Sequence, residues 1–239
     1  MKVIKKILII ILLIIIFIVS GFVYKGHELY KQALEQISIS DKVAEIKSDE
    51  NYTKLEDMSE FYKDAVIAVE DRRFYEHGAI DPIALARAIY SNIKAKELRE
   101  GGSTITQQLA KNIYFTQEKS ALRKIAEIFM AYDLEKKLNK DTILELYLNT
   151  SYFGDGYYCV AEASRGYYKK EPKNMNRNEA SMLAGIPNAP SAYCPTKHLD
   201  LAKKRQNQVL DKMVRYEFIT AEEKEEILNE SNAVEDNKD

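Results

Sequence analysis

The hydrophobic positions divide the chain into an apolar N-terminal run and a long region with helical spacing. Residues 7–23 carry no charge and are mostly Ile, Leu, Phe and Val, and three lysines precede them. At ~1.5 Å per residue a helix over this run spans roughly 26 Å, close to the ~30 Å hydrocarbon core of a bilayer. We therefore expect a transmembrane anchor over residues 7–24.

A cleaved signal peptide is the alternative interpretation of this N-terminus. Its apolar part normally has ~7–15 residues and ends at a small-x-small site, which the sequence Ser-Gly-Phe-Val-Tyr at residues 20–24 matches poorly. We favour an uncleaved anchor. By the positive-inside rule, residues 1–6 then form a cytoplasmic tail and the chain after residue 24 lies outside the cytoplasm.

The remaining residues predict a helical domain with two flanking segments. Residues 25–58 are polar with scattered aliphatic side chains, which we interpret as a stalk or linker. Over residues 59–220 the apolar positions recur at helical spacing and strand signals are nearly absent, so we predict a mainly α domain. Residues 221–239 hold eight acidic residues and two lysines, and we interpret them as an acidic C-terminal tail.

Composition and charge narrow the class of protein. The chain has 239 residues, of which 46% are hydrophobic and 30% charged, as in a globular protein. The net charge of the whole chain is −2. Without the acidic tail, the chain has 33 Lys and Arg residues and 29 Asp and Glu residues. This mildly basic body suits an anionic surface or ligand and lacks the clustered positive charge of a nucleic-acid binder. We expect no nucleic-acid partner.

The two cysteines, Cys159 and Cys194, could pair outside the cytoplasm. Two thiols in a domain of this size do not make a disulfide framework, however, and we favour free, partly buried thiols. Neither cysteine has the CxxC or Cys/His spacing of a metal site.

Three polar segments could carry chemistry. Residues 70–77 (EDRRFYEH) place acids and cations at the end of an apolar helix, where a partly desolvated carboxylate could act as a general base; a solvated helix end is the alternative. Residues 101–112 (GGSTITQQLAKN) could form an anion site at a helix start or an ordinary N-capped helix. Arg123 and Glu127 share a helix face, which for a random sequence would indicate a surface ion pair.

In this order, the three segments resemble the motifs of the peptidoglycan glycosyltransferases (glycosyltransferase family 51), found alone or as the transglycosylase domain of class A penicillin-binding proteins. Further matches are ILELYLN at residues 143–149, GIPNAPSAYCP at residues 185–195, and Arg205 followed by Val-Leu at residues 209–210. The resemblance covers roughly residues 59–220. It implies a lysozyme-like, mainly α-helical domain that polymerises lipid II on the outer face of the bacterial cytoplasmic membrane.

The resemblance also implies a reaction and residue roles. The donor is a polyprenyl-pyrophosphate-linked glycan, and the GlcNAc 4-hydroxyl of lipid II attacks it with inversion to form a β-1,4 bond. Glu70 would be the catalytic base, and Glu127 a second catalytic carboxylate on the donor side. Lys119 stands where the family commonly has Arg. The residues expected to bind substrate and pyrophosphate are Asp71, Phe74, His77, Gly102, Ser103, Thr104, Thr106, Gln107, Gln108, Lys111, Asn112, Lys119, Arg123, Lys124 and Arg205.

A divalent cation, Mg²⁺ or Mn²⁺, is expected near the pyrophosphate, because hard cations bind carboxylate and phosphate oxygens. Glu70 is a candidate ligand, and no organic cofactor is expected. A transpeptidase domain would need several hundred further residues, and only the acidic segment follows Ile219. We therefore expect a glycosyltransferase without transpeptidase activity, for which other cell-wall synthesis proteins are candidate partners.

Residues 80–98 carry an apolar face flanked by Arg87, Lys94, Lys96 and Arg99. Such a helix suits a membrane interface, where a lipid-linked substrate would enter. Core packing of the same face is the alternative, and we favour it.

Two other functions stay open for the whole chain. A lysozyme-like lytic enzyme would also use a carboxylate in a related α fold, but would cleave glycan. A non-catalytic, membrane-anchored scaffold for cell-wall assembly would tolerate the loss of Glu70 or Glu127. Both carboxylates are present, so we place the scaffold last.

Overall fold

The computed structural model describes residues 2–95, 101–116, 118 and 120–235, and this part of the chain is helical without a strand. The mainly α prediction is confirmed. The α-helices are α1 (Lys2–Gln36), α2 (Ile39–Lys47), α3 (Glu60–Glu70), α4 (Pro82–Ala95), α5 (Ile105–Tyr114), α6 (Ala121–Lys137), α7 (Lys140–Leu148), α8 (Val160–Tyr168), α9 (Arg177–Gly185), α10 (Pro190–Tyr193), α11 (Leu199–Arg215) and α12 (Ala221–Glu235). Short 3₁₀ turns are η1 (Leu55–Asp57), η2 (Phe74–Glu76), η3 (Pro172–Asn174) and η4 (Ile186–Asn188).

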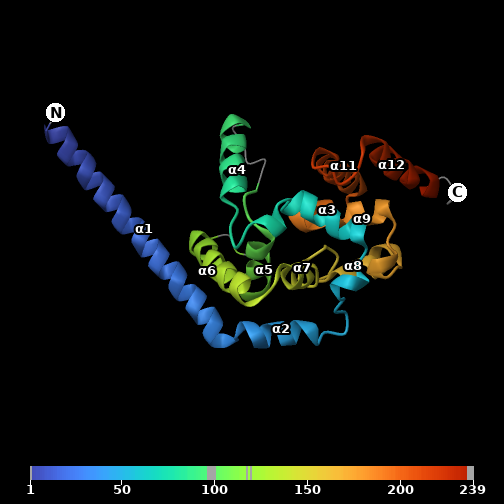
Figure 1. The fold of residues 1–239 in the computed structure, drawn as a ribbon, viewed down its shortest axis with the longest axis horizontal. Helices are drawn as coiled ribbons and strands as arrows, with labels where there is room; N and C mark the ends of the chain where they lie inside the picture. The colour runs from blue at the N-terminus through green and yellow to red at the C-terminus, as the bar shows by residue number, and fades with distance from the viewer. Residues whose placement is uncertain (1, 96–100, 117, 119, 236–239) are drawn as a thin grey trace.

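Helix α3 is the central element of the core. Its Tyr62, Ala65, Val66, Ala68 and Val69 are all buried, and it packs against α9 and α11. Helix α5 packs between α6 and α7 in the other half of the domain (Figure 1). The C-terminal end of α3 therefore meets α5 and α11, which come from distant parts of the sequence.

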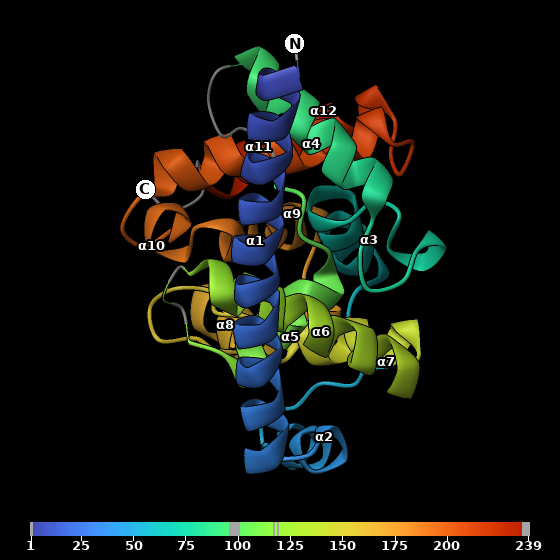
Figure 2. The same ribbon diagram turned by 90° about the vertical axis from the view of Figure 1, so that its left-hand side faces the viewer.

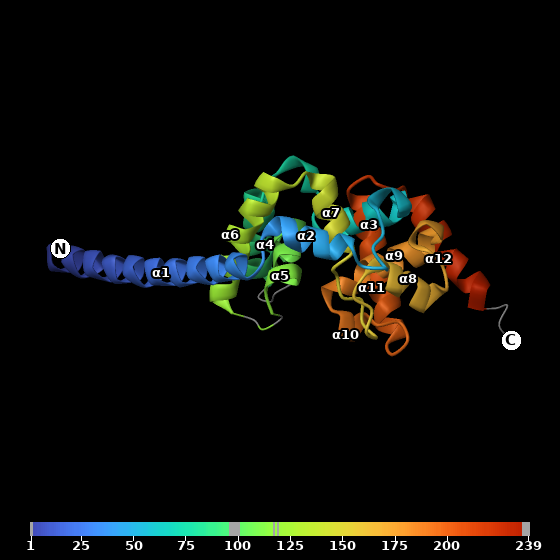
Figure 3. The same ribbon diagram turned by 90° about the horizontal axis from the view of Figure 1, so that it is seen from below.

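Helix α1 leaves the domain as a long, exposed rod (Figures 1 and 3). Among the described residues, only this helix contains a stretch long and apolar enough to cross a membrane, Ile4–Gln36. Its side chains are exposed from residue 4 to residue 25, and the helix then packs against α6. The predicted long apolar N-terminal helix is present.

The segment interpreted as a stalk, residues 25–58, packs on the domain instead of standing apart from it. Ala33, Ile39 and Met58 are buried in the same core as α3. The hydroxyl of Tyr52 donates to a carboxylate oxygen of Glu145 on α7. The scattered aliphatic residues of this segment are therefore core contacts, and the predicted boundary at residue 59 does not separate two bodies.

Helix α4 projects from the domain in the same general direction as the exposed half of α1 (Figures 1 and 2). Five of its apolar side chains are 47–73% exposed, and only Ala88 is buried. The core packing that we favoured for residues 80–98 is therefore wrong over residues 82–95, because no element within the described part of the chain covers this face. Lys96 and Arg99 lie outside the described residues. The exposed side chains are Ile83, Leu85, Ile89, Tyr90 and Ile93.

Both cysteines are buried and free, as expected. Cys159 caps the start of α8, where its sulfur accepts a hydrogen bond from the backbone N–H of Glu162. Cys194 follows α10, and its sulfur lies 3.5 Å from the hydroxyl oxygen of Tyr167.

Candidate active site

Glu70 is the last residue of α3, and its position follows from the apolar helix before it. The buried face of α3 carries the chain to the edge of the core, where the Glu70 side chain is 9% exposed. Its Oε2 accepts a hydrogen bond of 2.8 Å from the Nε2 of Gln108. Its Oε1 is buried and accepts no hydrogen bond within the described part of the chain. One oxygen is therefore held by a neutral donor and the other is available to accept a proton.

Arg205 of α11 places a positive charge beside Glu70. Its Nη2 lies 3.8 Å from Glu70 Oε1, and its Nε donates to the carbonyl oxygen of Gly185 at 3.3 Å. The Nζ of Lys212, also on α11, donates to the carbonyl oxygen of Val69 at 2.8 Å, which ties this helix to the end of α3. At 3.8 Å the guanidinium is beyond hydrogen-bonding distance, so Arg205 places a positive charge beside Oε1 without donating a hydrogen bond to it.

Gln108 is itself oriented by Tyr147, a residue of α7 that the sequence analysis did not assign to the site. The Tyr147 hydroxyl donates to Gln108 Oε1 at 3.3 Å, which leaves the amide nitrogen to point at Glu70. Burial raises the pKa of Tyr147 well above its ordinary value, and the nearby charge of Glu70 adds to this effect. The phenol therefore keeps its proton and remains a donor. Its place in the ILELYLN segment was the available sequence signal.

Glu127 lies on α6 and is buried, with 2% exposure. Arg123 Nε lies 3.2 Å from its Oε1 and Lys124 Nζ lies 3.0 Å from its Oε2. Lys124 also donates to Ser103 Oγ at 2.7 Å, which joins α6 to the loop before α5. The Arg123 and Glu127 side chains are mostly buried, whereas Lys124 is partly exposed, so the pair of Arg123 and Glu127 is not the surface ion pair considered from the sequence.

Lys111 lies on α5 and connects the two carboxylates electrostatically. Burial lowers its pKa, the charges of Glu127 and Glu70 oppose that effect, and Arg123 and Lys124 add to it. Helix α5 thus carries Gln108, which donates to Glu70, and Lys111, whose pKa is affected by the charges of both carboxylates.

A second network links the segment after α3 to the start of α5. Asp71 Oδ1 lies 2.8 Å from His77 Nε2, and Asp71 Oδ2 accepts a 3.1 Å hydrogen bond from the backbone N–H of Ile105. Thr104 caps α5 by accepting from the backbone N–H of Gln107, and its hydroxyl donates to the carbonyl oxygen of Ala79 at 2.8 Å. Asp71, His77 and Thr104 therefore hold the start of α5 in place.

Asp71, His77 and Asp81 are the described side chains whose donor atoms lie close enough together to hold a metal ion, within 4.8 Å of one another. Their donor atoms are already engaged. Asp81 accepts two hydrogen bonds from Arg73, at 2.9 and 3.0 Å, and further ones from the backbone N–H groups of Ile83 and Ala84. Although burial opposes it, the bond to Arg73 lowers the pKa of Asp81 to about 2. The cluster fits a structural ion-pair network better than a metal site, and Glu70 is not part of it.

Three of the remaining predicted site residues are buried inside the domain. Phe74 is fully buried in the core, where the Nζ of Lys140 lies 4.4 Å from its ring centroid. Thr106 and Gln107 are also buried, and the Thr106 hydroxyl donates to Glu135. These three side chains have structural positions in this conformation.

Gly102 and Asn112 border the site, and Lys119 lies outside the described residues. A Cβ at Gly102 would lie 3.1 Å from Leu85 Cδ1 of α4, so this position is close-packed. Asn112 is half-buried, one residue after Lys111 on α5. Arg123 Nη1 donates to the carbonyl oxygen of Thr116 at 2.9 Å, which anchors the segment before α6.

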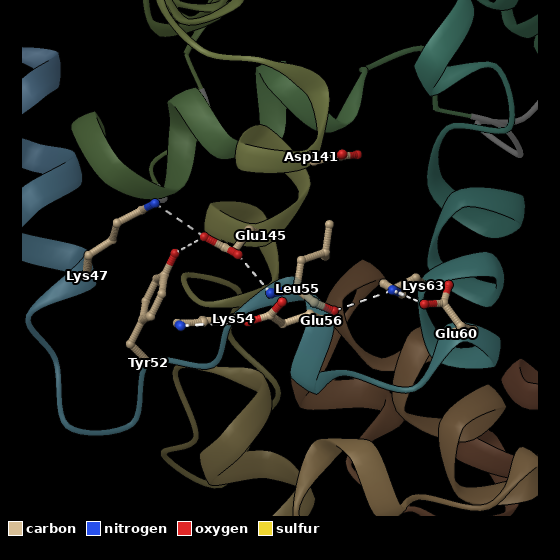
Figure 4. Close-up of a pocket in the computed structure, with 9 residues that line it drawn as sticks. All are labelled: Lys47, Tyr52, Lys54, Leu55, Glu56, Glu60, Lys63, Asp141 and Glu145. Carbon is tan, nitrogen blue, oxygen red and sulfur yellow. Dashed lines mark hydrogen bonds and ion pairs between the residues drawn. The ribbon is translucent and has the colours of Figure 1, made fainter.

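A separate cleft of about 710 Å³ lies against α7 and contains neither catalytic candidate (Figure 4). Glu145 lies at its centre, where it accepts from Tyr52 and from the backbone N–H of Leu55 and pairs with Lys47 at 3.4 Å. Glu145 therefore fastens residues 47–55 to α7. This structural contact accounts for the acidic residue in the ILELYLN segment.

Two mostly buried carboxylates, Glu70 and Glu127, thus lie beside cationic side chains within a helical domain. The family profile described as Transglycosylase matches residues 39–214. The chain therefore belongs to the transglycosylase family and contains a peptidoglycan glycosyltransferase domain. The matched region begins at α2, in agreement with the packing of that helix on the domain.

Two similar proteins are longer than this chain, and the matching region is only part of each of them. Penicillin-binding protein 1A of Neisseria lactamica is 41% identical over 206 residues, which are 85% of this chain and 26% of that protein. Penicillin-binding protein 1F of Bacillus subtilis (strain 168) is 41% identical over 212 residues, 85% of this chain and 30% of that protein. The chain thus spans between a quarter and a third of the length of these two relatives.

A solved structure also matches in sequence. The crystal structure of penicillin-binding protein 1A from Haemophilus influenzae is 31% identical, with 52% of this chain and 15% of that chain covered and a TM-score of 0.37.

Proposed function

We propose that this protein polymerises glycan strands of peptidoglycan from lipid II. It would transfer the polyprenyl-pyrophosphate-linked glycan to the GlcNAc 4-hydroxyl of lipid II with inversion, forming a β-1,4 bond. The observation that carries the proposal is the state of Glu70, whose Oε2 is held by Gln108 while its buried Oε1 accepts no hydrogen bond from the described residues. A carboxylate oxygen of this kind can act as a general base.

The reaction assigns a destination to each atom and charge. The acceptor oxygen forms a bond to C1 of the donor while the bond from C1 to the pyrophosphate oxygen breaks. The hydroxyl proton goes to Glu70 Oε1, and the electron pair leaves with the polyprenyl pyrophosphate. The guanidinium of Arg205, 3.8 Å from that oxygen, provides a positive charge beside the base.

The leaving group requires cations and hydrogen-bond donors rather than a strong acid. Lys111, Arg123 and Lys124 lie around Glu127 and provide this environment. Charge-assisted hydrogen bonds to phosphate are among the stronger polar contacts in proteins. Glu127 would hold Arg123 and Lys124 in place on the donor side.

A divalent cation, Mg²⁺ or Mn²⁺, remains part of the proposal. Glu70 Oε1 offers one unengaged carboxylate oxygen, and Mg²⁺ commonly takes one or two carboxylates together with substrate phosphates and water. If bound there, the ion would neutralise charge on the pyrophosphate. The described residues alone supply no complete ligand set at Glu70.

Helix α1 supports a proposal about the location of the protein in the cell. We propose that residues 7–24 span the bacterial cytoplasmic membrane, with the N-terminus in the cytoplasm and the domain outside. The exposed apolar face of α4 extends in the same direction as this part of α1 (Figure 2). Both apolar surfaces can therefore meet one bilayer, which is where lipid II and the lipid-linked glycan reside.

Polymerisation of labelled lipid II by the detergent-solubilised full chain tests the proposal. We expect glycan ladders from the wild type and a loss of about 10²-fold or more in Glu70→Gln, the size expected for a general base. Glu60→Gln, on the exposed start of α3, is the matched control and should retain activity. Assays with EDTA and with added Mg²⁺ or Mn²⁺ test the metal.

Other outcomes would select the two alternative functions. Release of soluble fragments from purified peptidoglycan, without ladders from lipid II, would show a lytic enzyme. Binding of lipid II without either product would show a scaffold.

A further inference from the structure

Helix α1 meets the catalytic helix α6 at Gly26, just beyond the apolar run. Gly26 is buried, whereas side chains from residue 4 to residue 25 are exposed. A Cβ at this position would lie 2.5 Å from Ile125 Cγ2, 2.7 Å from Ile125 Cβ and 3.2 Å from the carbonyl oxygen of Leu122. Any side chain larger than hydrogen would therefore force the two helices apart. Gly21, on the same helix, has nothing within 4 Å of its Cβ position.

The contact continues along both helices after Gly26. The ring of Phe129 on α6 lies 5.0 Å from that of His27 and 5.8 Å from that of Tyr30, centroid to centroid. The Tyr30 hydroxyl donates to the carboxylate of Asp133. Aromatic and polar contacts thus continue for about one turn of α1 and about two turns of α6 beyond the glycine, and together they join the two helices.

The same helix α6 carries the proposed donor-side charges. Arg123, Lys124 and Glu127 lie within one turn of Ile125, or about 5 Å along the helix axis. Gly26 lies two residues beyond the predicted membrane span, or about 3 Å along α1. The contact at Gly26 therefore fixes the distance between the cations of α6, Arg123 and Lys124, and the end of the apolar run of α1.

We infer that Gly26 is a positioning residue that sets the depth of the donor site relative to the membrane. This inference rests on the proposed function. By allowing α1 to lie against Ile125, Gly26 holds the cations of α6 at the level of the lipid phosphates. A polyprenyl pyrophosphate then reaches Lys124 and Arg123 while its lipid chain stays in the bilayer, whose polar region begins just outside the hydrocarbon core.

The inference makes a prediction that depends on the substrate. Gly26→Leu should raise KM about tenfold for lipid II embedded in vesicles, because ground-state and transition-state binding are lost together, with kcat nearly unchanged. For a water-soluble lipid II analogue with a short prenyl chain, KM should be unchanged, because that substrate can approach at any height. Gly21→Leu is the matched control and should change neither value.

A second variant tests the depth without disturbing the helix contact. Four alanines inserted between Val23 and Tyr24 lengthen α1 by ~6 Å and leave every contact from Gly26 onward in place. We expect the same selective loss on vesicle-embedded lipid II. This variant keeps the inference testable if Gly26→Leu does not fold, as judged by its thermal melting.

The outcomes separate this inference from the proposed function. Equal losses on both substrates, or no loss on either, would overturn the role of Gly26 in setting depth. Absence of glycan products from the wild type on both substrates would instead overturn the polymerase function.

Discussion

The side-chain amide of Gln108 donates to Glu70 Oε2 over 2.8 Å and joins the start of α5 to the end of α3. The same amide accepts from Tyr147 of α7 through its own oxygen. Three helices thus meet around one carboxylate. One of its oxygens is held by Gln108, and the other accepts no hydrogen bond from the described residues, which is the oxygen that the proposed reaction uses.

Removing the Gln108 amide should impair the base without unfolding the protein. We expect Gln108→Leu to lower kcat/KM about 10- to 100-fold, because Glu70 loses both its orientation and its hydrogen bond. Tyr147→Phe should have a smaller effect, because it removes only the hydroxyl that orients Gln108. Tyr62→Phe is the control, since its buried hydroxyl has no hydrogen-bond partner among the described residues. Equal activity in all three variants would contradict the role of Gln108.

Gly185 should be required for the position of Arg205. A Cβ at Gly185 would lie 2.9 Å from Arg205 Cγ and 3.3 Å from Val209 Cγ2. Gly185→Ala should therefore displace the guanidinium from Glu70 and lower kcat/KM about tenfold. Gly78→Ala is the matched control, because its Cβ position is open. A fully active Gly185→Ala enzyme would show that the position of Arg205 is not critical.

The ion pair between Arg73 and Asp81 should stabilise the domain above pH 4. The folded pKa of Asp81 is lowered to about 2, whereas an unfolded Asp titrates near ~3.9. The stabilisation is therefore complete above the unfolded pKa and is lost as the pH falls through about 2; it amounts to about 2 kcal/mol. Urea unfolding of Asp81→Asn between pH 7 and pH 2 should show lower stability at pH 7 and a weaker dependence on pH.

Asp57→Asn provides the comparison for this measurement. Asp57 is more than half exposed and lies 3.7 Å from Lys173, so its loss should change the free energy of unfolding little. If Asp81→Asn and Asp57→Asn have the same pH dependence of stability as the wild type, the Arg73 pair does not stabilise the fold.

The exposed face of α4 should matter for a membrane-embedded substrate and not for folding. Ile89→Glu replaces a side chain that is 52% exposed, so the melting temperature should stay nearly constant. Activity on vesicle-embedded lipid II should fall, because placing a charged carboxylate in the membrane interface is energetically unfavourable. Leu201→Glu, an exposed position on α11, should leave activity unchanged. A parallel loss in both variants would exclude a specific role for α4.

Several features of this protein can be predicted from the sequence because they depend on residues that are near one another in the chain. The uncharged run at residues 7–23 is long enough to span a bilayer whatever surrounds it. Helical spacing identified the mainly α domain. The resemblance of residues 70–77, 101–112 and 123–127 to the family motifs named the domain that the family comparison then showed.

The positions of the charges depended on the tertiary structure. Arg205 follows Glu70 by 135 residues, and only the packing of α11 on α3 brings their side chains within 3.8 Å. Tyr147 reaches the site in the same way, through Gln108. Side-chain contacts of this kind are set by long-range packing, which local spacing does not encode.

Burial was likewise decided by the fold. The periodicity of residues 82–95 showed an apolar face on α4, but not that its large side chains would remain uncovered. The aliphatic residues of 25–58 were too scattered to indicate a buried face, yet Ala33 and Ile39 belong to the core. The sequence by itself determined which helices form and which motifs they carry. The tertiary structure decided which faces are covered and which charges meet, because burial and pairing depend on neighbours distant in the chain.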